Sequence, residues 1–256
     1  MYSAGAPCAY FKRGRCVSPL TRHSWAVHDA AVLAAGRLLG PPRVLPGRAW
    51  LATALRVAAV YHDLGKAAES FQREGRSFRL HEHVGALILW MAAEKASREG
   101  NKGLAAVLMV AAGAVARHHA AMQGRHPVEI AESSKDLQDI VELAKQIPPG
   151  TPSLLAQGYI STVIEEALAE ARSEIDMRRA RHIIEAIKDM RYYDWDLLLD
   201  TMMVTGTIIV ADILVSSIQR SDRVTKSYAR SWMRELSINQ RRLNKLIAAV
   251  NRPTLP

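Results

Sequence analysis

The sequence has few cysteines and few aromatic residues, and each scarcity excludes a class of protein. Only Cys8 and Cys16 are cysteines among the 256 residues, too few for a disulfide framework or a cysteine-based zinc site. Two free thiols in a reducing compartment fit this count best, although the two could pair in an oxidising or hot environment. Aromatic residues make up 6% of the chain, and small and aliphatic residues dominate its apolar part. We therefore expect packed helices and not a strand-rich sandwich.

Long apolar runs are also lacking. The two most apolar stretches, residues 104–116 and 202–218, are shorter than the roughly 20 residues that span a bilayer. The second contains Asp212, and buried core helices explain both stretches better than membrane spans do. The first twenty residues carry three basic side chains without an apolar run before a cleavage site, so no secretory signal is expected. These features predict a cytoplasmic protein with no membrane partner.

Positive charge is in excess over negative charge. Lys and Arg number 34 against 25 Asp and Glu, a formal net charge of +9. The C-terminal residues 219–252 carry nine of the basic residues against two acidic ones, with Tyr228 and Trp232 among them. Such a segment favours a polyanionic partner, and aromatic rings among arginines suit base stacking on single strands. An amphipathic helix that packs on the core with a solvated basic face is the alternative, and both can hold.

Apolar periodicity predicts one all-α domain over residues 1–256, with its core at about 19–217 and a basic helical segment at 219–252. No internal repeat or alternating strand pattern is visible. Residues 69–79 are expected to be a loop with a short helical turn, and residues 148–152 are the clearest loop. The predicted helices cover residues 21–39, 47–64, 82–97, 104–119, 128–146, 154–190 (as two helices or one bent helix), 195–219 and 228–250.

The fragment 61–66, YHDLGK, carries the most chemical information. It places His62 and Asp63 side by side at the end of an apolar helix. A neutral nitrogen donor next to an anionic oxygen donor is the pair that a divalent cation favours. A surface pair that caps a turn is the alternative interpretation. The dipeptide recurs at His28-Asp29, where nothing in the surroundings indicates a site.

Further histidines and one aspartate strengthen the metal interpretation. His118 and His119 close the most apolar predicted helix, where two imidazoles have little structural purpose, although a lone histidine there is usually a satisfied core residue. Asp212 is the only carboxylate in the apolar run 208–215. Burying an ionised carboxylate costs several kcal/mol unless a cation or strong donors meet it. A salt bridge to an arginine is the alternative for Asp212.

A series of histidines and aspartates with characteristic flanks runs along the chain: His23 after Pro19-Leu20-Thr21-Arg22, His62-Asp63 with Lys66, His81 with Gly85 and Ala86, His118-His119, and Asp212 with Ser216. In order and rough spacing, this series resembles the HD superfamily of metal-dependent phosphohydrolases. The paired histidines and the basic charge are most similar to the CRISPR-associated HD nuclease, here as a standalone domain, and the resemblance covers residues 19–217. His83 competes with His81, and His28 competes with His23; the flanking residues favour His81 and His23.

The resemblance implies a helical domain with two divalent metal ions, from among Mn, Mg, Ni, Co and Fe, at the centre of the bundle. His23, His62, Asp63 and Asp212 would hold one ion and His81, His118 and His119 the other, with Asp63 bridging. Asp63 and Lys66 would be the catalytic residues, with Lys66 contacting a phosphate oxygen. A surface lysine after a capping glycine is the alternative for Lys66.

The activity that this resemblance implies is endonucleolytic cleavage of single-stranded DNA, with RNA as a further substrate, in CRISPR interference. No phosphate-cradling Gly-Lys-Ser/Thr loop follows, so a helicase subunit would be a separate polypeptide that acts with a CRISPR effector complex. Two rival functions stay open. One is an HD phosphohydrolase of small nucleotides, either a nucleotidase or a cyclic-nucleotide phosphodiesterase. The other is a non-catalytic helical protein that binds nucleic acid or a helicase.

Overall fold

The computed structural model describes residues 6–12, 14–38, 49–75, 79–119, 133–190 and 195–221. Within these ranges the chain is helical apart from one hairpin, which confirms the predicted all-α class. The predicted helix at 228–250, with most of the basic segment, lies outside the described residues. The helices are α1 (Leu20–Leu38), α2 (Ala49–Tyr61), the 3-10 helix η1 (Leu64–Ala67), α3 (Glu69–Glu74), α4 (His81–Arg98), α5 (Lys102–Arg117), α6 (Ser134–Lys145), α7 (Thr151–Leu155), α8 (Tyr159–Glu174), α9 (Met177–Lys188) and α11 (Trp195–Ser221).

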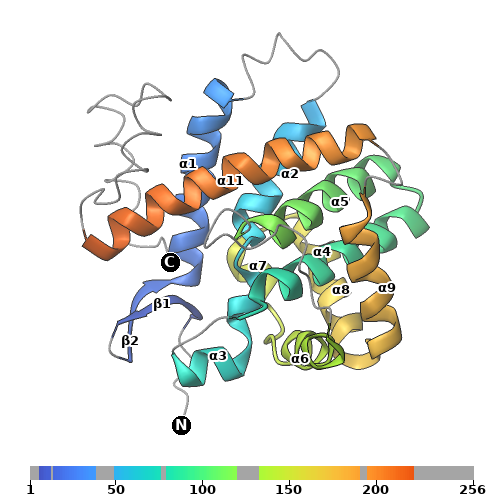
Figure 1. Ribbon diagram of the computed structural model, residues 1–256, viewed down its shortest axis with the longest axis horizontal. Coiled ribbons are helices and arrows are strands. Elements are labelled where there is room, and N and C mark those ends of the chain that lie inside the picture. Colours follow the sequence, from blue (N-terminus) through green and yellow to red (C-terminus); the bar gives the residue numbers. More distant parts are fainter. Residues whose placement is uncertain are drawn as a thin grey trace.

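Helix α4 lies at the centre of the bundle and is buried along most of its length. It packs against α5 on one side and against α6, α8 and α9 on another, while α11 crosses α1, α2 and α5 (Figure 1). Both α4 and α5 are apolar on nearly every side, as helices enclosed by others must be. The apolar side chains of all these helices form one continuous core. The packing brings the N-terminus of α4 beside the C-termini of α2 and α5.

Polar side chains set several helix boundaries. The side chains of Asn101, Ser133 and Asp176 accept hydrogen bonds from the main chain of the first turns of α5, α6 and α9, as N-cap residues do. The predicted helical region 154–190 is therefore two helices, α8 and α9, interrupted at Ile175 and Asp176. The expected loop at residues 148–152 is shorter than predicted, because α7 begins at Thr151 with a proline in its first turn.

Helix α11 is long and apolar enough, by length and composition, to cross a membrane between Asp196 and Gln219. However, 67% of its apolar window is buried inside the protein, as expected for a core helix.

A two-stranded hairpin that the sequence did not predict precedes α1. Strand β1 (Cys8–Lys12) pairs with β2 (Arg15–Pro19) in an antiparallel manner, and Gly14 turns the chain between them with φ of 77°, a conformation suited to glycine. The strands are too short and too irregular in register to show an alternating pattern.

Cys8 and Cys16 are joined by a disulfide bond across this hairpin, so the prediction of free thiols was wrong. The hairpin brings the two cysteines together although seven residues separate them in the chain. The expectation of a reducing compartment was based on free thiols, so the disulfide bond leaves that expectation without support. Cytoplasmic localisation therefore stays a prediction.

Arg117 joins α5 to α9 in the interior. Its guanidinium is buried and donates hydrogen bonds to the main-chain oxygens of Gly113, at 3.0 Å, and Ile187, at 2.8 Å. A third bond, to the oxygen of Lys188 at 3.4 Å, covers the C-terminal end of α9, where main-chain oxygens lack partners within the helix. Burial lowers the pKa of this arginine. Its role in the described residues is structural.

Candidate metal centre

Asp63 lies at the middle of a buried cluster of imidazoles. It follows the last turn of α2 and precedes η1, and its side chain is almost completely buried. One carboxylate oxygen, Oδ2, lies 3.3 Å from Nε2 of His23 and 3.4 Å from Nε2 of His62. The other, Oδ1, lies 3.1 Å from Nε2 of His81 and 3.8 Å from Nε2 of His118. The two oxygens of one carboxylate therefore face two different groups of histidines.

The first group lies between α1, α2 and α11. His23 comes from the first turn of α1, and its Nε2 lies 3.3 Å from Nε2 of His62. Asp212 of α11 reaches the same place, with Oδ1 3.2 Å from His23 Nε2. All of these side chains are buried. His23, His62, Asp63 and Asp212 thus come together, as the predicted first ligand set requires.

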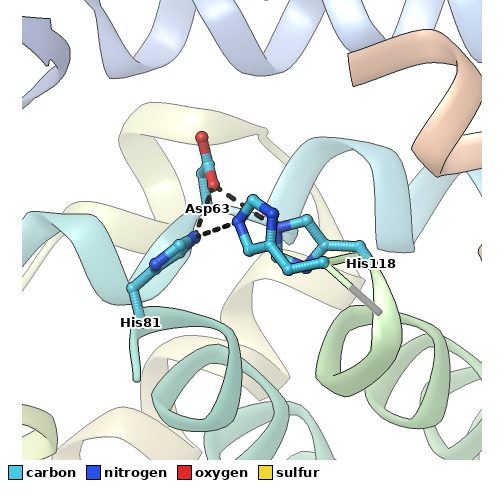
Figure 2. Close-up of side chains that lie close together, drawn as sticks. Asp63, His81 and His118 are labelled. Atoms are coloured by element: carbon cyan, nitrogen blue, oxygen red, sulfur yellow. Dashed lines mark hydrogen bonds and ion pairs between the residues drawn. The ribbon is translucent and has the colours of Figure 1, made fainter. Parts of the chain in front are cut away.

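The second group lies where α4 begins and α5 ends. Figure 2 shows the side chains of His81 and His118 directed at Asp63. His119 adds a third imidazole, with its Nε2 3.1 Å from that of His81. The ligand atoms of these four residues all lie within 4.8 Å of one another, as do those of His23, His62 and Asp63. All seven predicted ligands therefore belong to one cluster with Asp63 between two halves.

Contacts outside the cluster fix which nitrogen two of the imidazoles, His62 and His118, turn inward. Nδ1 of His62 lies 2.8 Å from the main-chain oxygen of Ala59, and Nδ1 of His118 lies 2.6 Å from that of Val115. A carbonyl oxygen can only accept, so in each pair Nδ1 carries the hydrogen. When such a ring is neutral, as a metal ligand must be, its Nε2 atom presents the lone pair to the cluster. Histidines that bind metals are oriented in this way by their second nitrogen.

The two histidines that competed for a place in the cluster lie outside it. His83 follows His81 by two residues on α4 and is buried, but its nearest charged partner is Glu82, 3.6 Å away, and not Asp63. His28 is only half-buried and pairs with the exposed Asp29 at 3.1 Å. His81 and His23, which the flanking residues favoured, are therefore the members of each pair that lie in the cluster, and their role as metal ligands stays a prediction.

The buried groups of the cluster shift one another's pKa values. Burial alone raises the pKa of Asp63, yet the nearby His62, the charge of Lys66 and a hydrogen bond with His23 hold it well below its usual value. Burial lowers the pKa of His23, but Tyr10 and then the hydrogen bonds with Asp212 and Asp63 raise it well above its usual value. Carboxylates that keep a proton on a buried imidazole will also favour a metal cation at that place.

The donor set fits divalent cations. Asp63 Oδ1 and His118 Nε2 are buried and make no well-aligned hydrogen bond among the described residues, although Oδ1 lies 3.1 Å from Nε2 of His81. Such buried polar atoms are costly unless something else meets them. Burial lowers the pKa of His62 and, with the nearby His118 and His81, that of His119, so both rings are neutral donors. Five imidazoles and two carboxylates suit transition metals such as Mn, Fe, Co or Ni better than an all-oxygen site would.

Lys66 faces the same carboxylate. Its Nζ donates a hydrogen bond of 2.7 Å to Oδ2 of Asp63 from one turn further along, and the side chain is buried. Burial lowers the pKa of Lys66, but the charge of Asp63 more than offsets this and raises it. The alternative of a surface lysine is therefore wrong. Lys66 is a cation at the edge of the cluster, and its catalytic role stays a prediction.

The comparison with protein families agrees with this geometry. Residues 21–150 match the HD domain family. This chain belongs to the HD domain family. The matched range contains every predicted ligand except Asp212, which α11 brings back to the site. No curated protein matches the chain. An HD domain with this buried cluster is, in general terms, a metal-dependent phosphohydrolase.

Several residues that contact the HD site could not be recognised as such in the sequence. Tyr10 of β1 lies edge-on to His23, with ring centroids 5.0 Å apart. The side-chain oxygen of Gln219 lies 2.9 Å from Nδ1 of His23, and an amide oxygen there fixes Nε2 of His23 toward the cluster. Glu82 lies 3.2 Å from Nδ1 of His81. Tyr10 and Gln219 are close to His23 only in the folded chain, so no local spacing indicates their position.

Proposed function

We propose that this HD domain is a metal-dependent nuclease that hydrolyses phosphodiester bonds of single-stranded DNA, and of RNA as a further substrate. The observation that carries the proposal is the position of Asp63, whose two oxygens face two separate groups of histidines. Two cations shared by one bridging carboxylate suit a phosphodiester, because two metal ions can act on the attacking and the leaving oxygen.

Different residues of the chain would bind the two cations and contact the phosphate. His23, His62, Asp63 and Asp212 would hold one ion, and Asp63, His81, His118 and His119 the other. Divalent cations at these places supply Lewis acidity to the phosphodiester and to the attacking water. Lys66, already a buried cation at the edge of the site, would balance the charge that develops on a phosphate oxygen.

A polymeric substrate is supported by charge. The net charge of +9 and the basic residues among 219–252 provide the attraction that phosphate backbones need. The partners that we propose, a separate helicase subunit and a CRISPR effector complex, are supported by the resemblance of the paired histidines to the CRISPR-associated HD nuclease. The rival substrate is a small nucleotide, which would gain less from the basic segment.

The test is cleavage of a circular single-stranded DNA in the presence of Mn²⁺. Asp63→Asn keeps the size of the side chain but removes the charge that bridges the two groups, and it should reduce cleavage to background. Asp29→Asn is the matched control, because His28-Asp29 is the same dipeptide at an exposed place outside the cluster. It should cut like the wild type.

The outcomes separate the rival functions. Linear products from the circle show internal cleavage by the wild type and support the proposal. If the wild type leaves the circle intact but releases phosphate from nucleotides or opens a cyclic nucleotide, the small-nucleotide function replaces it. If neither substrate is consumed with Mn²⁺, Ni²⁺, Co²⁺, Fe²⁺ or Mg²⁺, the non-catalytic alternative is correct.

A further inference from the structure

The hydroxyl of Ser216 donates to an uncommon hydrogen-bond partner within α11. Serine and threonine hydroxyls inside a helix often bond the main-chain oxygen four residues earlier. Thr201, Thr205 and Thr207 of the same helix all do so, with distances of 2.8, 2.7 and 2.9 Å. Ser216 instead donates to the side-chain oxygen Oδ1 of Asp212, at 2.9 Å, although that residue also lies four positions earlier. Some other contact must favour this rotamer of Ser216.

Tyr10 makes that contact from the hairpin. Its hydroxyl is hydrogen-bonded to Oγ of Ser216, across 206 positions of sequence. A serine hydroxyl has one hydrogen, and Ser216 gives it to Asp212, so the Tyr10 hydroxyl is the donor to Ser216. The result is a directed chain of hydrogen bonds from Tyr10 through Ser216 to Asp212. Bonds arranged in this way polarise and strengthen one another.

The hairpin that carries Tyr10 is fastened to the segment that carries Lys66. The side chain of Gln72, on α3, accepts from the main-chain nitrogen of Cys8 at 2.8 Å and donates to its oxygen at 2.9 Å. The same amide group donates to the main-chain oxygen of Lys66 at 2.6 Å. The disulfide bond from Cys8 to Cys16 closes the hairpin two residues from Tyr10. Gln72 and the disulfide bond therefore both hold the strand that carries Tyr10 at Cys8.

We propose that Tyr10 is a positioning residue of the metal centre, which acts through Ser216 to hold the Asp212 carboxylate beside His23. Without the tyrosine hydroxyl, Ser216 would turn to the main-chain oxygen that its neighbours in α11 use, and Asp212 would lose the hydrogen bond that Ser216 donates. The carboxylate would then be held less firmly at its position 3.2 Å from Nε2 of His23. This inference rests on metal binding by the proposed ligands but not on the choice of substrate.

The experiment measures Mn²⁺ binding by the full chain, by electron paramagnetic resonance of the free ion. Tyr10→Phe removes only the hydroxyl, because the ring contacts with His23 and with Nζ of Lys66, 4.9 Å from the ring centroid, are kept. We expect one of the two Mn²⁺ sites to bind roughly tenfold more weakly, since partners that orient metal ligands are typically worth 10–100-fold in affinity. Tyr159→Phe, at a tyrosine that is 59% exposed, should bind like the wild type.

A double-mutant cycle tests the route through Ser216. Ser216→Ala should weaken the same Mn²⁺ site by the same factor as Tyr10→Phe, and the double variant should be no weaker than either single variant. A purely structural effect of the hairpin would not produce this saturation. Circular dichroism and the urea midpoint establish that each variant is folded.

The outcomes are distinct. Wild-type affinity in Tyr10→Phe overturns the inference and leaves the metal centre standing, and so does a double variant whose loss is the product of the two single losses. If Tyr10→Phe does not fold, Ser216→Ala decides, because it removes the relay without altering the hairpin: weaker binding supports the inference, and unchanged binding overturns it. A wild-type protein that binds no Mn²⁺ overturns both the metal centre and the role of Tyr10.

Discussion

Replacing Gly65 with alanine should separate the two halves of the metal centre. Gly65 is buried in η1, between Asp63 and Lys66, and packs against the first residue of α4. A Cβ atom at this position would lie 2.2 Å from the main-chain oxygen of His81, 2.8 Å from its carbonyl carbon and 2.9 Å from its Cα. These are main-chain atoms, so no side-chain rotation relieves the contact. The two segments must move apart by about 1 Å to reach ordinary nonbonded distances.

The expected cost follows from that displacement. Overpacking of a core typically costs 1–3 kcal/mol, and the rigidity of the atoms involved places Gly65→Ala in the upper half of that range, at about 2–3 kcal/mol. The same shift would widen the 3.1 Å approach of Asp63 to His81, and a misplacement of about 1 Å in an active site can cost on the order of 100-fold in rate. Urea denaturation measures the first effect, and the proposed cleavage of single-stranded DNA with Mn²⁺ measures the second.

Two other glycines provide a control and an intermediate case for this prediction. Gly206→Ala is the control, because Gly206 is exposed within α11 and nothing lies within 4 Å of its added Cβ; alanine should stabilise the helix by up to about 1 kcal/mol. Gly85→Ala should be intermediate, since its Cβ would lie 3.3 Å from a side-chain carbon of Val115, which can shift slightly. Wild-type stability and activity in Gly65→Ala would refute the close approach of η1 to α4.

Three further predictions concern other parts of the chain. His81→Gln should weaken Mn²⁺ binding strongly, whereas His83→Gln should leave it unchanged, because only His81 faces Asp63; isothermal titration calorimetry distinguishes them, and equal losses would contradict the geometry. Reducing the bond between Cys8 and Cys16 should lower the free energy of unfolding by about 2.5 kcal/mol, from the entropy of a loop of this length. Guanidinium denaturation with and without dithiothreitol measures this, and a protein without either cysteine should not respond to the reductant. Arg117→Met should cost about 2–3 kcal/mol of stability, because it removes charge-assisted hydrogen bonds to buried main-chain oxygens of α5 and α9; a urea midpoint like that of the wild type would argue against this role.

The residues of the candidate site could largely be predicted from the sequence because their positions conflict with ordinary core packing. Adjacent imidazoles at the end of an apolar helix, such as His118 and His119, and a carboxylate inside one, such as Asp212, require a compensating partner. The choice between His81 and His83 is different in kind. Side chains two positions apart on a helix point in nearly opposite directions. Only the rotation of α4 about its axis in the bundle determines whether His81 or His83 faces Asp63.

The hairpin and its contacts could not be predicted in the same way. Two five-residue strands with irregular register show no alternation, and the count of two cysteines does not reveal that the fold places them together. The contact between Tyr10 and Ser216 joins positions 206 residues apart, and neither residue conflicts with its local surroundings. A polar residue whose hydrogen bonds are all made within the folded chain does not stand out in the sequence. A buried polar residue that lacks a partner unless a ligand binds does stand out.

The spacing of the metal centre follows from close main-chain approach at both sides of one turn of α4. On one side, the absence of a side chain at Gly65 lets the main chain of His81 pack directly against η1. On the other side, Gly85 packs against α2 and α5: an added Cβ would lie 3.5 Å from the main-chain oxygen of Tyr61, the last residue of α2, and would also contact a side chain of α5. These contacts place the start of α4 against the ends of α2 and α5, where His81, Asp63 and His118 lie. Ligands that are carried on packed helix ends are held more rigidly than ligands on free loops. The two halves of the site can therefore keep one carboxylate between them even though His23 and Asp212 reach it from α1 and α11.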